Sequence, residues 1–232
     1  STNAFKGSGI RELDIPDTET TIEESAFENT KNLQKLDIPE SVTKIESRAF
    51  YGSNISEITL PTSNVELSTS LFENTTNLKR VTLPIGETKI HEKMFKGSGV
   101  TEVVVPESVV SIEKSAFENS GLISYEVPDS ITSIKENAFK DSNRLVNIYF
   151  YNPLVDIDLS STTLPDSTII HGLNSSTAKA YANKHNRIFE LIEDTGPTVP
   201  IQVLTYDKYK DKSLGITVRL GVGDLKATSV TE

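Results

Sequence analysis

Residues 25–39 read SAFENTKNLQKLDIP, and residues 115–128 repeat the same order of residue types as SAFENSGLISYEVP. Each stretch places a small residue before Phe and then leads through polar residues to an apolar-x-x-apolar-x-apolar run that ends at Pro. Recurrence at a fixed period is the signature of a repeat protein, in which each copy builds one structural unit. The fold therefore depends on how far this pattern extends along the chain.

The pattern extends over most of the first 150 residues. Phe recurs every 22 or 23 residues at Phe5, Phe27, Phe50, Phe72, Phe95, Phe117 and Phe139. Pro precedes each Phe after the first by eleven residues, and an aliphatic residue follows that Pro by six, at Ile22, Ile45, Leu67, Ile90, Ile112 and Ile134. The apolar run appears in every copy, from Ile10/Leu13/Ile15 to Leu145/Ile148/Phe150. Because these positions recur at constant offsets from one another, the sequence predicts about seven coils.

Each copy is interpreted as one coil of a repeat solenoid. The apolar run predicts a short strand with alternate residues inward, and Pro ends the strand because it lacks the N–H that a ladder needs. The aliphatic residue after Pro turns inward again, and a short turn or single-turn helix carries the Ala-Phe pair into the core. One coil cannot bury its own apolar side, so neighbouring coils must stack. The predicted fold has a parallel β-sheet on one face and short helices or turns on the other.

Composition excludes several classes of function. The formal net charge is −10, which disfavours binding to nucleic acid and to anionic membrane surfaces. The chain has no Cys, so disulfides, thiolate metal sites and a Cys nucleophile are absent. No apolar run is long enough to cross a bilayer. The chain begins without Met inside a repeat, so we interpret it as a trimmed piece whose export signal and anchor would lie outside it.

The repeat resembles the BspA-like leucine-rich repeats of surface proteins from host-associated bacteria, whose pattern is I-x-x-x-A-F-x-x-C-x-x-L-x-x-I-x-I-P. The resemblance covers about residues 1–192. This chain departs from it three residues after Phe, where Ser or Thr replaces Cys; we expect this slot to be half-buried. The resemblance implies a non-enzymatic, adhesin-like binding module, extracellular or at the cell surface. Its implied partners are a host matrix protein, a bacterial surface protein or a glycan.

The domain plan follows from where the period stops. We expect the repeat array over residues 1–166, with residues 151–166 breaking the period, and a C-terminal cap over 167–193. The cap is predicted as strand, helix and strand, the helix beginning near Ser175 or Ser176 and burying Ala178, Tyr181 and Ala182. A Pro/Gly linker spans 194–200. Residues 201–232 form a partial β-sandwich-like segment that resembles the start of the immunoglobulin-like X modules of clostridial scaffold proteins.

Candidate binding residues lie at the second and third variable positions of each apolar run, which are expected on the concave side of the sheet. The first column reads Glu12, Lys35, Glu57, Arg80, Glu102, Ser124 and Asn147, and the second reads Asp14, Asp37, Thr59, Thr82, Val104, Glu126 and Tyr149. Alternating signs in the first column favour a self-neutralising ladder over a recognition surface. Asp14 with Asp37 is a candidate for attracting a cation or a basic partner. Val104, Glu126 and Tyr149 form a less polar candidate patch.

Motifs for chemistry are missing. His91, His171 and His185 share no metal-ligand spacing and are interpreted as surface groups. Carboxylates recur with the repeat or lie in turns, no G-x-S-x-G occurs, and the Gly-Ser-Gly turns lack the lysine of a phosphate loop. The sequence therefore predicts no catalytic, cofactor or metal site. An alternative to the binding module is a structural spacer that displays neighbouring modules, either as a monomer or with weak end-to-end association.

Overall fold

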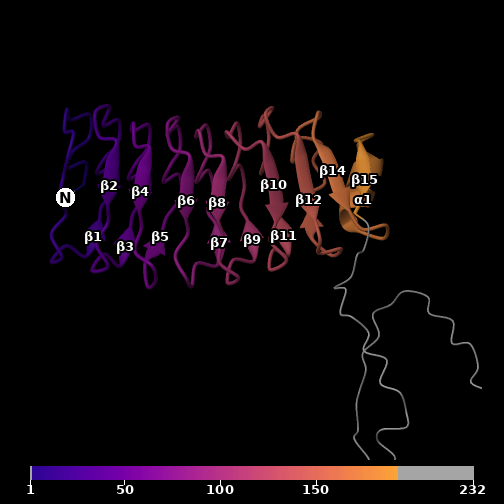
Figure 1. The fold of residues 1–232 in the computed structure, drawn as a ribbon, viewed down its shortest axis with the longest axis horizontal. Coiled ribbons are helices and arrows are strands. Elements are labelled where there is room, and N and C mark those ends of the chain that lie inside the picture. Colours follow the sequence, from indigo (N-terminus) through magenta and orange to yellow (C-terminus); the bar gives the residue numbers. More distant parts are fainter. Residues whose placement is uncertain (1, 193–232) are drawn as a thin grey trace, which may run out of the picture. The chain divides into compact units, whose positions relative to one another are not determined.

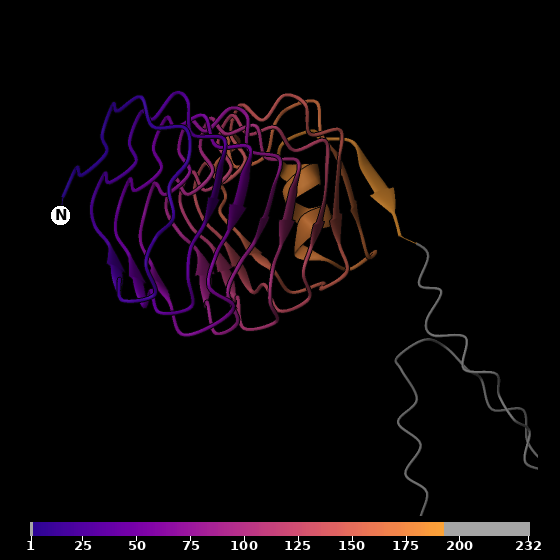
Figure 2. The same ribbon diagram turned by 60° about the vertical axis from the view of Figure 1, so that its left-hand side comes forward.

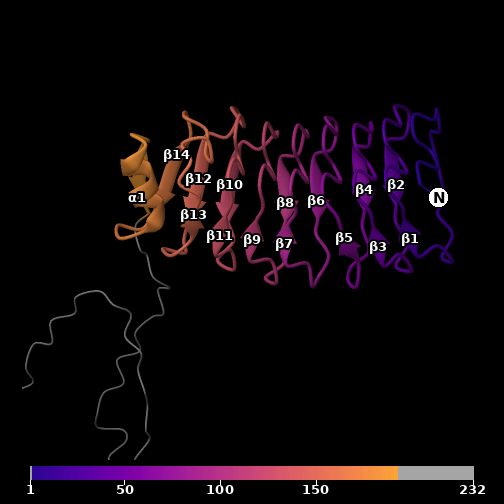
Figure 3. The same ribbon diagram turned by 180° about the vertical axis from the view of Figure 1, so that it is seen from behind.

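The computed structural model describes residues 2–192, so the expected linker at 194–200 and the β segment at 201–232 lie outside the described residues. The described part forms a stack of coils with two rows of parallel strands, shown from opposite sides in Figures 1 and 3. The first row contains β2 (Lys35–Asp37), β4 (Glu57–Thr59), β6 (Arg80–Thr82), β8 (Glu102–Val104), β10 (Ser124–Val127), β12 (Asn147–Phe150) and β14 (Ile169–Gly172). The second contains β1 (Thr21–Ile22), β3 (Lys44–Ile45), β5 (Glu66–Leu67), β7 (Lys89–Ile90), β9 (Ser111–Ile112), β11 (Ser133–Ile134) and β13 (Asp156–Ile157).

The even-numbered row confirms the predicted strands and their register. Leu36 pairs with Ile58 and Val81 with Val103, so apolar residues of successive copies face the core together. The ladder is divided into β2-β4, β6-β8 and β10-β12-β14-β15, where β15 spans Phe189–Leu191. No pairing joins β8 to β10 within residues 2–192. The sheet predicted as continuous is therefore three parallel pieces in one row.

The odd-numbered row was not predicted as strands. Each of its strands is two residues long, and all except β13 end at the aliphatic residue six positions after Pro, for example Ile45 and Ile112. These residues are buried, as the pattern predicted. Figure 2 shows the two rows on different sides of the stack, joined by turns at both ends of each coil. Of the short turn or single-turn helix expected for the Ala-Phe pair, the structure has the turn, because these residues form hydrogen-bonded turns.

The Phe residues form a continuous column through the core. Their rings stack from Phe5 to Phe139 with centroids 5.3–5.6 Å apart and planes 8–13° from parallel. Each Phe N–H also donates to the residue just before the next Phe, as from Phe27 to the Ala49 carbonyl at 2.7 Å. These turns thus form a third ladder between coils, which satisfies backbone groups that would otherwise be buried without partners.

Each turn around Phe needs two residues with left-handed backbone. The residues two before and two after Phe have positive φ, and the second position alternates between Gly and Asn from Gly7 to Asn119. Gly and Asn adopt this conformation at least cost among the common residues. At Gly97 an added Cβ would also meet the side chain of Asn74 in the preceding coil. The alternation therefore provides room for each Asn side chain over the next glycine.

The slot three residues after Phe is more buried than expected. Thr30, Thr75 and Ser142 are inaccessible to solvent, and each hydroxyl donates to a Phe carbonyl. Ser120 and Ser142 also share a hydrogen bond of 3.1 Å between coils. A hydroxyl can make these bonds in a slot that has no access to water. The expectation of a half-buried slot is wrong for every copy except the first, where Ser8 is partly accessible.

Residues 151–166 form an eighth coil, which corrects the expectation that they break the period. β13 pairs with β11, and Ile157 lies beside Ile134 in the odd-numbered row. Phe139 N–H donates to the Thr163 carbonyl, so Thr163 and the buried Leu164 take the place of Ala-Phe. The eighth coil was not recognised in the sequence because Leu164 stands where the other coils have Phe. It follows Phe139 by 25 residues instead of 22. β14 then pairs with β12, with Tyr149 beside His171, so the strand expected in the cap continues the even-numbered row.

The C-terminal end is covered by α1 (Thr177–Lys184), which packs against β13, β14 and β15 (Figure 3). Ser176 is its N-cap and accepts a hydrogen bond from Lys179 N–H. Ala178, Tyr181 and Ala182 are buried, as the sequence predicted. At the other end, residues 10–15 form no strand, in contrast to the expectation, and Ile10, Leu13 and Ile15 are only partly buried. These side chains pack against the core from one side only.

The close approach of coils at Gly99 is testable. A Cβ there would overlap the Thr76 carbonyl, whereas at Gly9, in the same slot of the first coil, the nearest atom is 3.7 Å away. We expect Gly99→Ala to cost about 1–3 kcal/mol, because a packed backbone must shift. Gly9→Ala should change stability by less than about 0.5 kcal/mol. Urea denaturation followed by circular dichroism measures both, and equal losses would contradict the packing described.

A buried hydroxyl gives a second stability test. Tyr125 is 6% exposed, its ring is tilted between Phe117 and Phe139, and its hydroxyl has no hydrogen-bond partner among the described residues. Burial raises the pKa of this hydroxyl. Tyr125→Phe removes an unsatisfied polar atom and keeps the ring, so we expect a gain of about 1 kcal/mol in the free energy of unfolding. A loss of comparable size in thermal and urea denaturation would show that the hydroxyl is bonded.

Candidate functional site

The candidate site is the strand face, defined as the outward side chains of the even-numbered strands. Alternation along each strand places the predicted candidates there. Glu57, Arg80 and Glu102 are exposed, whereas Asn147 and Tyr149 are half-buried. The exposed candidates are Glu12, Asp14, Lys35, Asp37, Glu57, Arg80, Glu102, Val104 and Glu126. The strand face therefore presents a grid of side chains on a fixed backbone.

The N-terminal half of the strand face is charged, and only some of its charges pair. Arg80 lies 3.3 Å from Glu102 across β6 and β8, as an alternating ladder requires. Lys35 instead pairs with Asp37 on its own strand at 3.6 Å, and Glu57 has no ion pair within residues 2–192. Such exposed pairs contribute at most about 1 kcal/mol each. The expected self-neutralising ladder is thus present at one pair and absent at Lys35 and Glu57.

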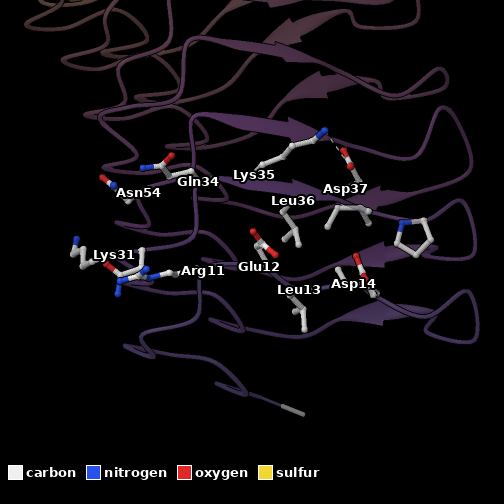
Figure 4. Close-up of a pocket in the computed structure, with 14 residues that line it drawn as sticks. Arg11, Glu12, Leu13, Asp14, Lys31, Gln34, Lys35, Leu36, Asp37 and Asn54 are labelled. Atoms are coloured by element: carbon white, nitrogen blue, oxygen red, sulfur yellow. Dashed lines mark ion pairs between the residues drawn. The ribbon is translucent and has the colours of Figure 1, made fainter.

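A hollow of about 990 Å³ lies between residues 11–15 and β2 (Figure 4). It is open because residues 11–15 do not pair with β2. Glu12 and Asp14 line it from the first coil, and Lys35 and Asp37 line it from β2. The two carboxylate oxygens of Asp37 already contact Lys35 and the Thr59 hydroxyl, the latter at 2.7 Å. Both carboxylate oxygens of Asp37 therefore already have partners within the protein. This does not support the candidate cation site formed with Asp14.

The C-terminal half of the strand face carries aromatic residues. Tyr149 and Glu126 are register partners on β12 and β10, as the sequence predicted, and His171 on β14 follows Tyr149. The rings of Tyr149 and His171 stack with centroids 4.2 Å apart and planes 14° from parallel. His171 also lies 2.9 Å from Asn147 Oδ1 through Nε2 and 3.5 Å from Glu190 through Nδ1. His171 is thus part of the strand face, but its side chain is only 12% exposed, so it is less accessible than the surface group that was expected.

Two exposed apolar side chains directly precede the strands of this half. Ile123 and Val146, at the first variable position of their runs, are 48% and 50% exposed, and the Val146 N–H donates to the Ile123 carbonyl. Val104 is also exposed, but it lies on β8, across the break in the ladder from Glu126. Along the stack the strand face therefore changes from charged side chains to a mixture of polar and aromatic ones.

Glu126 is the unpaired carboxylate of this half. It is exposed and has neither a hydrogen bond nor an ion pair in the described part of the chain. Burial, together with the negative charge of Glu126, raises the pKa of the nearby Tyr151 hydroxyl. The patch thus combines aromatic rings, apolar side chains and one free negative charge. This combination suits contact with a partner better than it suits solvent.

A second titratable pair lies away from the strand face. Glu87 is buried in the slot three residues after Pro, where Val42, Val109 and Ile131 stand in other coils. His91, with a side chain 12% exposed, has its Nε2 3.3 Å from Glu87 Oε1 and is therefore not the surface group that was expected. Burial opposes ionisation of Glu87, but His91 and the N–H groups of Thr88 and Lys89 outweigh it and lower the pKa of Glu87.

Comparison with known proteins identifies the repeat. The family description of the BspA type leucine rich repeat region, in six copies, matches residues 1–123 and 65–186. No curated protein matches this chain. Within residues 2–192 no helix has the length and apolar character that a membrane crossing requires. The same residues contain no cluster of three His, Asp or Glu side chains arranged for a metal ion.

Among the similar solved structures, one with a TM-score above 0.5 shows the same fold. A leucine-rich repeat protein from Bacteroides ovatus ATCC 8483 matches 82% of this chain and 57% of its own, with a TM-score of 0.59 and 18% identity. The pneumococcal vaccine antigen PcpA matches 75% of this chain and 60% of its own, with a TM-score of 0.48 and 18% identity. A leucine rich cell surface protein from Faecalibacterium prausnitzii A2-165 matches 78% and 60%, with a TM-score of 0.33 and 18% identity. This chain spans less than two thirds of the length of each.

The Glu87 slot predicts a dependence of stability on pH. Because the folded pKa of Glu87 lies below its unfolded value, its ionisation stabilises the fold above the unfolded pKa, and this contribution is lost as pH falls through the folded pKa. Glu87→Val removes one partner of this buried pair and leaves His91 and the N–H groups of Thr88 and Lys89 without their acceptor, so it should destabilise the fold by about 3–5 kcal/mol at pH 7. This deficit should shrink between pH 6 and pH 3, because the wild type loses the contribution of ionised Glu87 there.

Thermal denaturation across this pH range measures the effect. Glu19→Val is the matched control, because Glu19 occupies the same slot in the first coil and is exposed. Its pH profile should stay close to that of the wild type. A constant difference between Glu87→Val and the wild type from pH 6 to pH 3 would contradict the role given to Glu87.

Proposed function

The chain belongs to the BspA-type leucine-rich repeat family, and on that premise we propose that it is a non-enzymatic binding module of a bacterial surface or secreted protein. It recognises its partner through the strand face. The observation that carries this proposal is the exposure of the unpaired Glu57 and Glu126 on one row of strands, with the exposed Ile123 and Val146 directly before β10 and β12. Solenoids bind partners on such extended surfaces.

The core positions of the repeat are constant and its outward positions vary, which supports this proposal. Phe, Pro and the inward aliphatic residues are the same in successive coils, because stacking requires them. The outward positions differ from coil to coil, so their side chains can match a partner without altering the core. Backbone ladders fix the spacing of these side chains before binding, which lowers the entropic cost of recognition. A host matrix protein, a bacterial surface protein or a glycan is a candidate partner on this basis.

A spacer that only displays neighbouring modules is the second candidate function. The continuous Phe column and the three backbone ladders favour it, because they make the array stiff along its length. A spacer needs a soluble surface but no specific one. The charged N-terminal half of the strand face fits that need, whereas the exposed Ile123 and Val146 do not. The two functions therefore differ in what substitution of the strand face does.

Retention on coated surfaces separates them. We would pass the whole chain over immobilised fibronectin, fibrinogen, collagen and mucin by surface plasmon resonance. Glu57→Lys with Glu126→Lys changes both halves of the strand face and should weaken retention at least about tenfold, because it replaces complementary charges with repulsive ones. Glu66→Lys with Asp156→Lys is the matched control, since it makes the same change in charge at exposed positions of β5 and β13. The control should retain the affinity of the wild type.

Two results would contradict binding through the strand face. Equal losses in both variants would mean that net charge alone controls retention. Absence of retention of the intact array on every surface would favour the spacer.

A further inference from the structure

We propose that the C-terminal half of the strand face binds an arginine side chain of a partner polypeptide, with the guanidinium paired to Glu126 and stacked on Tyr149. The inference rests on the proposed function and specifies its site and partner chemistry. We call the surface the aromatic patch and define it by Ile123, Glu126, Val146, Tyr149, His171 and Glu190.

The stacking geometry decides which ring surface is available. β12 lies between β10 and β14, and the rings of Tyr149 and His171 lie one above the other along the direction from strand to strand. Both rings must therefore stand up from the sheet with their edges outward. His171 covers one face of Tyr149. The other face points toward β10, where Glu126 is the register partner of Tyr149.

A hydrogen bond with Asn147 and a longer contact with Glu190 hold His171 in this arrangement. Asn147 Oδ1 lies 2.9 Å from one ring nitrogen, and a carboxylate oxygen of Glu190 lies 3.5 Å from the other. Two contacts on opposite sides of the imidazole fix its plane, and the imidazole in turn supports the phenol ring of Tyr149. Tyr149 is half-buried as a result. Its open face is thus set before a partner arrives, which favours binding.

Glu126 supplies the charge that a cation requires. Glu102, in the preceding copy, is already paired with Arg80, and Glu190 is shared with His171. Glu126 has no partner among residues 2–192. A guanidinium is planar, so it can stack on the phenol face while its N–H groups pair with the carboxylate beside it. An ammonium cannot make both contacts equally well, because it is compact and strongly hydrated.

The apolar neighbours indicate that the arginine belongs to a polypeptide. Ile123 and Val146 are about half exposed and directly precede β10 and β12, the strands that carry Glu126 and Tyr149. A polypeptide that runs along these strands and brings apolar side chains next to its arginine would bury them. A neutral glycan fits less well, because it would leave the Glu126 carboxylate beside Tyr149 without an ion pair. Aromatic rings and apolar side chains around one ion pair are typical of the centres of protein interfaces.

The test uses defined peptides with the whole chain. A fluorescein-labelled peptide in which arginines alternate with leucines is compared by fluorescence polarisation with the same peptide carrying citrulline, which keeps the shape of the guanidinium but has no charge. Chitotetraose serves as the glycan probe in competition. We expect the arginine peptide to bind at least about tenfold more tightly than the citrulline peptide, because charged hydrogen bonds are the stronger ones. Chitotetraose should not displace it.

Variants locate the binding on the patch. Glu126→Gln and Tyr149→Leu should each weaken binding of the arginine peptide about tenfold. Glu66→Gln is the matched control, because Glu66 is also an exposed carboxylate with no ion pair among residues 2–192, but it lies on β5, outside the strand face. It should leave the affinity within about twofold of the wild type. In NMR spectra the His171 ring protons should shift on binding, since they lie against the stacked Tyr149.

Several outcomes would overturn the proposal. These are equal binding of the arginine and citrulline peptides, equal losses in Glu126→Gln and Glu66→Gln, displacement by chitotetraose, and no binding of the arginine peptide at all. If Glu126→Gln and Tyr149→Leu are still retained like the wild type on a matrix protein, the arginine site is wrong while the proposed function stands. If the intact array binds neither the peptide nor any coated surface, both proposals fail.

Discussion

The contact on which the rest of the structure depends is the one that each Phe makes with the next coil. Its ring stacks on the next ring, and its N–H bonds to the carbonyl just before that ring. Aromatic pairs add about 0.5–1.5 kcal/mol each beyond their buried area, and the backbone bond is satisfied where water has no access. Repetition of this contact sets one spacing for all coils. The strands on both rows inherit their register from it.

This constraint separates residues that build the array from residues that distinguish its coils. The core slots tolerate limited change: Leu164 replaces Phe at the eighth coil, and Glu87 replaces an aliphatic residue with the help of His91. The strand face changes freely, from ion pairs near β2 and β6 to stacked rings near β12 and β14. A graded surface on a uniform core is what a binding module requires, and it places the candidate site where the charge ladder ends.

Periodicity in the sequence predicts the coils, the even-numbered strands, the inward residues and the cap helix. It misses the odd-numbered strands, because two residues are too few to show alternation. It misses the stacking of His171 on Tyr149, although residues 169–172 follow β12 at the same 22-residue step, because the segment was interpreted as a cap instead of a copy. The sequence also does not show which charged side chains form ion pairs. Lys35 pairs with Asp37 on its own strand, and Glu57 has no ion pair among the described residues.

Hydrogen exchange of the Phe amides tests the central contact most directly. Phe27, Phe50, Phe72, Phe95 and Phe117 each donate to the next coil from a turn that lies outside both rows of strands. If these bonds hold the stack together, their amides should exchange as slowly as those of the paired strands, because both then open only with the array. Exchange as fast as in the exposed turns after Pro would contradict this account, and would leave the strand ladders alone to set the spacing of the coils.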